Sequence, residues 1–435
     1  MNRKLIVASL AGSLCGFLFG YDIGAMAGAA PDVRASFGLS PSGLGLAVSS
    51  ALLGTIAGSV SAGRLADRFG RRETIATAGI LYAIAILPAA FAGALAPFAA
   101  CRFLCGVAIG VISVVVPMYM AEIAPSRLRG RIVGLFQLSV SIGVVTAFLM
   151  GYLLSRRTHA DLAWRLMIAG GMVPILLALL CLLLSPASPH WLALRGRIAD
   201  ARASLAALGS AHPDSEAARI SSSLEDAKQA NLPKLFSRRY SRPIALAVSI
   251  AMFNQFTGIN ALLYYLLDVF KDLGSGSLNG RVDAIVLSST SLAVTILAIF
   301  FIDRVGRKPL LLAGATGMGI CLLLLPAIRH YAWPASAVVA VYVGYNACFG
   351  FSQGAVIWIY LSEIFPVSMR ARGQSLGTTV HWATNALVVG TFPVLVSHLG
   401  EKVFLGLALL MALQFLVILL FYPETKGRAL ESPAT

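Results

Sequence analysis

The sequence predicts an all-α membrane protein of twelve transmembrane helices, in two pseudo-symmetric six-helix halves joined by a short cytoplasmic helical segment. Its composition excludes a soluble globular chain, because 58% of the 435 residues are hydrophobic and only 12% are charged. The mean hydropathy is +0.81, as expected of a chain that crosses a bilayer many times. Twelve apolar segments have lengths suited to transmembrane helices, near residues 5–29, 43–62, 74–95, 97–120, 132–154, 164–184, 243–270, 283–302, 309–328, 335–361, 373–397 and 402–422.

The first apolar segment follows a basic start, Met-Asn-Arg-Lys, and in this respect resembles a signal peptide. Tyr21 and Asp22 lie within the apolar run, which argues against cleavage and predicts a retained first helix. The six cysteines of the chain all fall inside apolar segments, so no disulfide framework is expected.

The net charge of +15 is distributed in a way that indicates topology and not nucleic-acid binding. Most Lys and Arg residues fall in segments that are cytoplasmic if the N-terminus is inside, which predicts a multi-pass protein of the inner membrane with both termini cytoplasmic. The chain turns polar between residues 185 and 242, where Pro213 and Pro233 interrupt helical patterning. The predicted divisions are a first half at 1–184, a cytoplasmic helical linker at 185–242, a second half at 243–424 and a cytoplasmic tail at 425–435.

The two halves repeat one another at their predicted inner ends. Residues 67–72 (Asp-Arg-Phe-Gly-Arg-Arg) follow the second segment, and residues 303–308 (Asp-Arg-Val-Gly-Arg-Lys) follow the eighth. Two six-helix copies joined by a long inner loop are typical of transporters, which hold a substrate near the midplane between the copies.

Charged residues near these ends are predicted to form an inner gate, which bridges helices only when the inner mouth is closed. Single exposed ion pairs contribute about 0–1 kcal/mol each, but a network of several can bias a two-state equilibrium. For any single Arg, a role in setting the topology is an equal alternative. The predicted gate residues are Asp67, Arg68, Arg71, Glu122 and Arg129 in the first half and Asp303, Arg304, Arg307, Glu363 and Arg370 in the second.

The seventh segment carries amide side chains where hydrocarbon surrounds a helix. Asn254, Gln255 and Asn260 are costly at that depth unless each finds a hydrogen-bond partner. Neutral amides donate and accept without the cost of a buried charge, which suits a ring of vicinal hydroxyls, and Tyr264 adds a flat apolar wall with a polar tip. The alternative is that the amides join neighbouring helices. Two adjacent amides with a third at helical spacing favour a polar ligand.

Two ionisable residues lie deep in the predicted first half, Asp22 in the first segment and Arg102 in the fourth. An isolated charge inside the membrane is expensive, so the two are expected to pair. Any event that separates them would let Asp22 take a proton. A static structural ion pair is the alternative.

Four motifs occur in a fixed order along the chain: residues 63–72 (Gly-Arg-Leu-Ala-Asp-Arg-Phe-Gly-Arg-Arg), residues 117–122 (Pro-Met-Tyr-Met-Ala-Glu), Gln255 with residues 258–260 (Gly-Ile-Asn), and residues 423–427 (Pro-Glu-Thr-Lys-Gly). The first motif alone is shared with drug exporters and is weakly specific. The set in this order resembles the sugar porter branch of the major facilitator superfamily, and the likeness spans about residues 12–428.

The resemblance implies the major facilitator fold and a central sugar site. It nominates Phe19, Gln137, Trp358 and Asn385 as sugar contacts, beside the residues of the seventh segment. It also implies a proton-coupling role for Asp22 and Arg102, because proton-coupled bacterial members carry Asp at this place while passive ones often carry Asn. The predicted substrate-binding residues are Phe19, Gln137, Asn254, Gln255, Asn260, Tyr264, Trp358, His381 and Asn385.

The sequence departs from the family pattern at several of these places. Asn254 stands where a Gln is usual, Ser291 where Asn is frequent, and His381 where Asn or Gln is common. The tenth segment lacks the usual Pro after Gly354, which predicts a softer helix break. Residues 186–191 lack the acid and Arg of the family, which predicts a weaker inner gate there.

The predicted function is import of a monosaccharide, D-glucose or a related hexose, together with a proton by an alternating-access carrier that acts as a monomer. No cofactor, metal or nucleic acid is expected, and nothing in the sequence indicates an enzyme. The alternatives are a passive sugar facilitator, a pentose–proton or polyol–proton symporter, an exporter of drugs or sugar-like compounds, and a transporter-like sensor. The polar seventh segment argues against drug export, and the short tail after Lys426 offers little for signalling.

Overall fold

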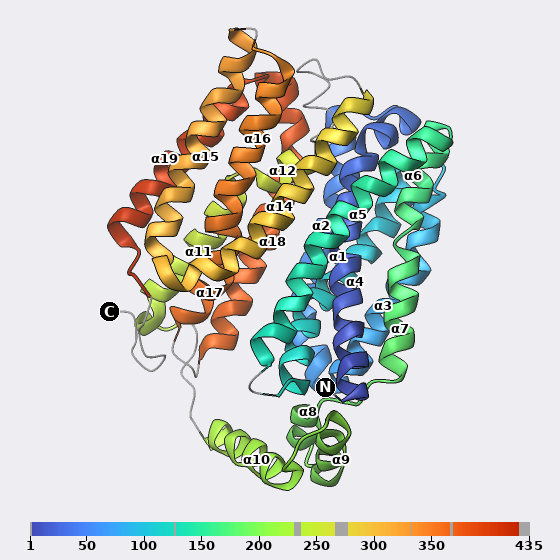
Figure 1. Ribbon diagram of the computed structural model, residues 1–435, viewed down its shortest axis with the longest axis vertical. Coiled ribbons are helices and arrows are strands. Elements are labelled where there is room, and N and C mark those ends of the chain that lie inside the picture. The colour runs from blue at the N-terminus through green and yellow to red at the C-terminus, as the bar shows by residue number, and fades with distance from the viewer. Residues whose placement is uncertain are drawn as a thin grey trace. The chain divides into compact units, whose positions relative to one another are not determined.

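A computed structural model describes residues 2–125, 128–229, 236–265, 277–331, 333–365 and 369–425. Within these ranges the chain is helical and contains no strand. Long helices dominate, and each begins close to one of the apolar segments predicted above (Figure 1).

The helices up to residue 229 are α1 (Arg3–Phe37), α2 (Pro41–Phe69), α3 (Arg71–Ala90), α4 (Leu95–Ile123), α5 (Arg129–Arg157), α6 (Ala160–Ala169), α7 (Met172–Leu183), α8 (Pro189–Leu194), α9 (Ile198–Leu208) and α10 (Pro213–Gln229). Beyond residue 236 they are the 3-10 turn η1 (Arg238–Tyr240), α11 (Ser241–Phe256), α12 (Ile259–Tyr264), α14 (Ser277–Val305), α15 (Arg307–His330), α16 (Ala335–Phe349), the π-helical turn η2 (Gly350–Gly354), α17 (Ala355–Glu363), α18 (Arg370–Leu399) and α19 (Lys402–Phe421).

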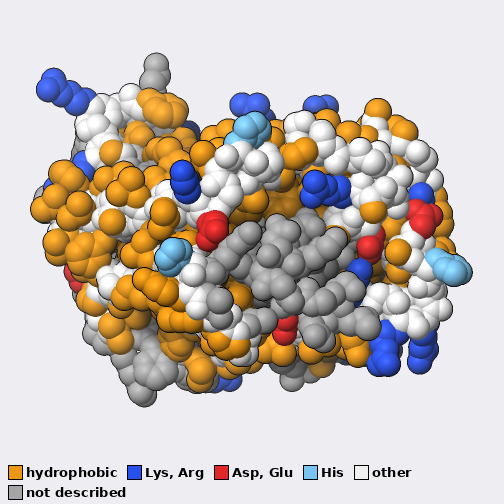
Figure 2. All heavy atoms as spheres, turned by 90° about the horizontal axis from the view of Figure 1, so that it is seen from above, with side chains coloured by type: hydrophobic (Ala, Val, Ile, Leu, Met, Phe, Trp, Pro, Cys, Tyr) orange, Lys and Arg blue, Asp and Glu red, His pale blue; other side chains and the backbone are white. Residues whose placement is uncertain are grey.

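The predicted all-α, twelve-span architecture is confirmed. Ten helical stretches among the described residues are long and apolar enough to cross a membrane. The other two predicted segments are also helical, one as α14 and the other as α16, η2 and α17 in succession. Many large apolar side chains are exposed, for example Ile84, Leu183, Leu409 and Leu420, as expected of helices that face lipid. Figure 2 shows the molecule from above, where Lys, Arg, Asp, Glu and His side chains lie among the hydrophobic ones.

The repeated motif after the second and eighth segments has a backbone reason for its glycine. Gly70 separates α2 from α3 with φ +101°, and Gly306 separates α14 from α15 with φ +106°. Only glycine adopts such angles without strain. The motif therefore turns the chain sharply at equivalent places in the two halves.

The described residues group into two compact units. Unit 1 contains Met1–Ile23, Ser50–Val144 and Arg165–Leu232, and unit 2 contains Gly24–Ser49, Val145–Trp164 and Pro233–Thr435. The boundary between them therefore falls inside α1, directly after the residue pair Asp22–Ile23.

In unit 1, α8, α9 and α10 lie beyond one end of the long helices, near the N-terminus (Figure 1). They bury a small core of their own that includes Leu192, Ala201, Leu205 and Ile220. Ser188 caps α8 by accepting a hydrogen bond from the Trp191 backbone N–H, and Pro189 begins the helix. The helical patterning predicted between residues 196 and 230 is thus present as α9 and α10.

In unit 2, α11 packs against α18, and α15 packs against α16 and α19. Aromatic and aliphatic side chains from α11, α15, α17 and the end of α19 form one buried cluster, with Tyr360 stacked on Tyr422 at 5.3 Å between ring centroids. This packing fixes the positions of α11 and α18, which carry four of the nine predicted substrate-binding residues, namely Asn254, Gln255, His381 and Asn385.

Candidate functional site

The helix of the seventh segment is broken at its polar centre. Its apolar length predicts one helix, but α11 ends at Phe256 and α12 begins at Ile259, with Gly258 at φ +84° between them. The Thr257 hydroxyl accepts a hydrogen bond from the Ile259 backbone N–H at 3.2 Å, and the Tyr345 hydroxyl donates to the Thr257 carbonyl at 2.7 Å. These bonds satisfy backbone groups that a break inside a membrane would otherwise leave exposed.

Amide side chains surround this break and bond to one another. The Gln255 Nε2 lies 2.9 Å from the Asn254 Oδ1, and the Asn260 Nδ2 lies 2.8 Å from the Gln255 Oε1. The same Gln255 Nε2 lies 3.1 and 3.2 Å from the two ring nitrogens of His381 in α18. The Asn254 Nδ2 donates to the Gln353 carbonyl at 3.3 Å. The predicted residues Asn254, Gln255, Asn260 and His381 therefore form one connected set in unit 2.

The tenth apolar segment, formed by α16, η2 and α17, softens near this set and does not break. The five residues of η2 form a single π-helical turn, and α17 follows without interruption, as the missing Pro predicts. Trp358 in α17 is 39% exposed and its ring lies 5.1 Å from that of His381. A flat aromatic face thus lies beside the amides. Ser291, which stands where the family often has Asn, donates its hydroxyl to the Asn346 Oδ1 at 3.0 Å.

Not every polar atom of this region has a partner in the described part of the chain. The Asn385 Oδ1 and both amide atoms of Gln353 are buried without a hydrogen bond to a described residue. Gln353 is a site candidate that the sequence analysis missed. Like Gln255, it is a glutamine inside an apolar segment, and the same reasoning could have identified it. Buried amides of this kind are costly unless a ligand or an ordered water completes them.

Three other predicted sugar contacts differ in their burial. Tyr264 is buried in unit 2, while Phe19 is half-buried and Gln137 exposed in unit 1.

In unit 1, the predicted ion pair between Asp22 and Arg102 is present. The two guanidinium nitrogens of Arg102 lie 2.5 and 2.8 Å from the two carboxylate oxygens of Asp22. The side chains are 2% and 6% exposed, respectively, so the pair is fully withdrawn from solvent. Tyr82 of α3 also donates its hydroxyl to the Asp22 Oδ1 at 2.9 Å. The sequence analysis did not nominate Tyr82, whose only signal was a phenol within an apolar segment.

Several predicted inner-gate residues of the first half contact one another. The Arg71 Nε lies 3.1 Å from Glu122, and its Nη1 lies 3.1 Å from the Asp67 carboxylate. Ser188 donates its hydroxyl to the Glu122 Oε2, and the Trp191 indole donates to the Asp67 carbonyl at 3.0 Å. Residues 186–191 therefore hold Glu122 and the end of α2 without the charged residues usual in the family.

In the second half, Arg307 and Glu363 pair at 2.9 Å between Nη2 and Oε1. Glu424 of the Pro-Glu-Thr-Lys-Gly motif accepts hydrogen bonds from the backbone N–H groups of Arg307 and Lys308, both at 3.0 Å. A carboxylate at the start of α15 suits the positive end of the helix dipole. In the first half, the predicted gate residue Arg68 has its guanidinium over the Phe69 ring. The side chains of the other predicted gate residues, Arg129, Asp303, Arg304 and Arg370, lie outside the described part of the structure.

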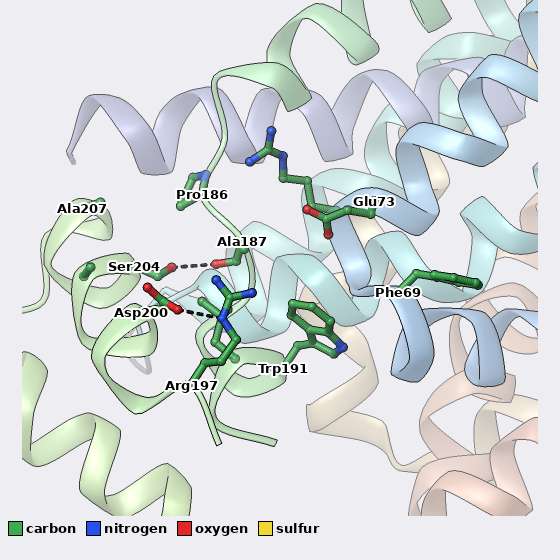
Figure 3. Close-up of a pocket in the computed structure, with 12 residues that line it drawn as sticks. Phe69, Glu73, Pro186, Ala187, Trp191, Arg197, Asp200, Ser204 and Ala207 are labelled. Carbon is green, nitrogen blue, oxygen red and sulfur yellow. Dashed lines mark hydrogen bonds and ion pairs between the residues drawn. The ribbon is translucent and has the colours of Figure 1, made fainter. Parts of the chain in front are cut away.

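A cavity of about 620 Å³ lies in unit 1 between the end of α2, the start of α3 and the α8–α9 segment. Figure 3 shows Trp191 and Arg197 facing it, with Arg197 bonded to Asp200 and Ser204 bonded to the Ala187 carbonyl. Its lining includes two arginines and two acids, Arg72, Arg197, Glu73 and Asp200. The balanced charge gives this cavity no preference for an anion or a cation.

Comparison with known proteins supplies the family. A family model described as "Sugar (and other) transporter" matches residues 8–434, almost the whole chain. The chain belongs to this sugar transporter family. The family resemblance read from the four motifs is thereby confirmed, and the protein is a multi-pass membrane transporter by family.

The relatives of this transporter are named for different sugars. The arabinose-proton symporter of Bacillus subtilis is 32% identical over 434 residues, which cover 98% of this chain and 94% of the relative. The glucose transporter GlcP of Staphylococcus epidermidis is 33% identical over 446 residues, covering 99% and 96%. A solved structure of the xylose transporter XylE from E. coli, in a partially occluded inward open conformation, has a TM-score of 0.86 at 30% identity and covers 98% and 99%.

Proposed function

We propose that this transporter imports a monosaccharide together with a proton across the inner membrane by alternating access, with both termini cytoplasmic. The observation that carries the proposal is the buried pair Asp22–Arg102 in a chain of the sugar transporter family. A passive carrier needs no ionisable group at this depth, where an ion pair is expensive to bury. The name of the arabinose-proton symporter supports the same coupling.

The proposed coupling step is a proton exchange at the Asp22 carboxylate. When Asp22 takes a proton from outside, its attraction to the Arg102 guanidinium weakens, and the helices α1 and α4 that carry them are free to rearrange. Release of the proton to the inside restores the charge and the pair. The Tyr82 hydroxyl, 2.9 Å from the Asp22 Oδ1, gives the carboxylate a third hydrogen bond in the paired state.

The proposed sugar site is the amide set around the break between α11 and α12. Asn254, Gln255 and Asn260 supply donors and acceptors for vicinal hydroxyls, and Trp358 supplies an aromatic face for the apolar side of a sugar ring. Asn385, Phe19, Gln137, Tyr264 and His381 are proposed to complete the site as the two halves enclose the substrate.

We propose a hexose such as D-glucose as the substrate, and a pentose as the second candidate. The glucose transporter among the relatives supports the first, and the arabinose and xylose carriers support the second. His381, in a position where the family commonly has an amide, changes the hydrogen bonds available at the centre of the site. Substrate choice is therefore expected to depend on it.

The charged residues at the helix ends are proposed to act as the inner gate. Arg71 with Asp67 and Glu122, and Arg307 with Glu363, tie helix ends together within each half. A network that changes between two states of the carrier would bias their populations.

The experiment that tests the proposal is uptake of labelled sugar into proteoliposomes that contain the purified transporter. An inward pH gradient is expected to drive glucose above its external concentration, and a protonophore is expected to abolish this accumulation. Equilibration without accumulation would instead support passive facilitation. Competition by arabinose and xylose measures the preference between hexose and pentose.

A further inference from the structure

An ion pair joins the last part of α1 to the start of α14. The Arg281 Nη2 lies 2.8 Å from the Asp32 Oδ2, and its Nη1 lies 3.5 Å from the Gly28 carbonyl oxygen. The side chains are 14% and 19% exposed. A charge-assisted bond that is partly withdrawn from water is stronger than an ordinary surface ion pair.

The two residues come from different six-helix halves of the chain. Nevertheless, Asp32 and Arg281 belong to the same compact unit, because residues 24–49 group by contact with the chain beyond residue 233. A second contact in this unit has the same pattern. A Cβ added to Gly45 of α2 would lie 2.1 Å from the Gly390 carbonyl oxygen of α18, so the two helix backbones touch.

We propose that the pair Asp32–Arg281 is an outer latch, which closes the outer ends of the two halves over the substrate path and opens once in every transport cycle. The proposal rests on the alternating access and the orientation proposed above, in which the end of α1 and the start of α14 face outside. Alternating access requires the outer ends to separate whenever the site opens outward. Asp32 and Arg281 must then part, so the pair favours the outward-closed state.

The latch is connected to the proton site through one helix. Asp22 and Asp32 both lie on α1, about 15 Å apart along its axis. The unit boundary falls between them, directly after Ile23. The helix is continuous between the two residues, so movement of α1 at Asp22 is transmitted to the pair.

The test is amide hydrogen exchange of the purified full-length transporter in lipid nanodiscs without sugar. Asp32→Asn and Arg281→Gln should each raise exchange in peptides from the end of α1 and the start of α14, by about five- to thirtyfold. The double variant should exchange no faster than either single variant, because the two residues act through one contact. The exchanged pair, Asp32→Arg with Arg281→Asp, should restore protection at least in part.

Arg34→Gln is the matched control. Arg34 lies in the last turn of α1, is exposed, and makes no ion pair with a residue that the structure describes. Its loss removes a charge from the same helix end and should leave exchange unchanged. Peptides around Asp22 and Arg102 report whether each variant is folded.

The latch is refuted if the single variants exchange like the natural protein, or if Arg34→Gln raises exchange equally. A variant with raised exchange around Asp22 as well as at the latch is globally destabilised, and then the double-variant comparison decides between a specific contact and general loosening. Since exchange is measured without sugar, a failure to transport sugar would refute the proposed function and leave this result interpretable.

Discussion

The proposed proton site (Asp22, Arg102 and Tyr82) and the amide set are both buried polar regions, but they differ in which of their groups have hydrogen-bond partners. Asp22 accepts two bonds from Arg102 and one from Tyr82, so each oxygen of the carboxylate has a partner. Beside the amide set, the Gln353 side-chain amide and the Asn385 Oδ1 lack a described partner. The Arg102 Nε also lacks a described partner, so the proton site has one open donor. Open donors and open acceptors occur together only at Gln353 and Asn385 beside the amide set, among these described residues, and a hydroxylated ligand can use both.

The difference also concerns charge. The proton site holds a charged pair whose members depend on each other, so removal of one leaves the other exposed to a low-dielectric surrounding. The amide set is neutral, and the loss of one member leaves hydrogen bonds unmade but no charge unpaired. Substitutions in the two regions should therefore differ in kind as well as in size.

The largest effect is expected from Asp22→Asn, which keeps the shape of the side chain but carries no exchangeable charge. Accumulation of sugar driven by a pH gradient should be abolished in proteoliposomes, while exchange of labelled for unlabelled sugar across an equilibrated membrane persists. Some loss of thermal stability is expected too, because Arg102 remains buried without its counter-charge. If this variant still concentrates sugar, the proton carrier is another residue.

Gln255→Ala should weaken sugar binding by about ten- to a hundredfold, because the amide bonds to Asn254, Asn260 and His381 and faces the substrate in the proposed site. Isothermal titration of the purified protein measures the affinity, and the amount of protein recovered from the membrane measures folding. Unchanged affinity with poor recovery would show that Gln255 only joins helices.

Gln353→Leu tests the central claim about open donors and acceptors. Removal of a buried amide without a partner should raise the melting temperature of the sugar-free protein, by an amount equivalent to about 1–3 kcal/mol. The same change should lower sugar affinity severalfold if the amide bonds the substrate. A stabilised protein with normal affinity would mean that Gln353 takes no part in binding, and a destabilised one that its amide has a partner after all.

Tyr82→Phe should have the smallest effect, since it removes one of three hydrogen bonds to a carboxylate. The carboxylate then keeps only its two bonds to Arg102, so accumulation of sugar driven by a pH gradient should fall by about two- to tenfold. Uptake of labelled sugar into proteoliposomes measures the change. Tyr21→Phe is the control, because the Tyr21 hydroxyl bonds the Met167 carbonyl and not Asp22. Accumulation equal to that of the natural protein would show that the Tyr82 hydroxyl takes no part in coupling.

The sequence by itself determined the membrane class and the twelve helices, and it singled out the repeated halves and the residues proposed here as the proton and sugar sites. These follow from local properties, because hydropathy decides which stretches enter the bilayer and because a buried charge or amide is conspicuous wherever it occurs. The pairing of Asp22 with Arg102 was predictable for the same reason. A buried charge is costly unless an opposite charge lies beside it, and these two were the ionisable residues deep in the first half.

Only the tertiary structure decided which side chains complete these groups. Tyr82, Gln353 and Ser188 contact Asp22, Asn254 and Glu122, respectively, from segments far apart in the chain. No local sequence pattern specifies such contacts. The break at Gly258 depends on the Tyr345 hydroxyl, which comes from another helix. The pair Asp32–Arg281 depends on the packing that brings α1 beside α14. Helix formation is a property of neighbouring residues, whereas these contacts are properties of how whole helices pack.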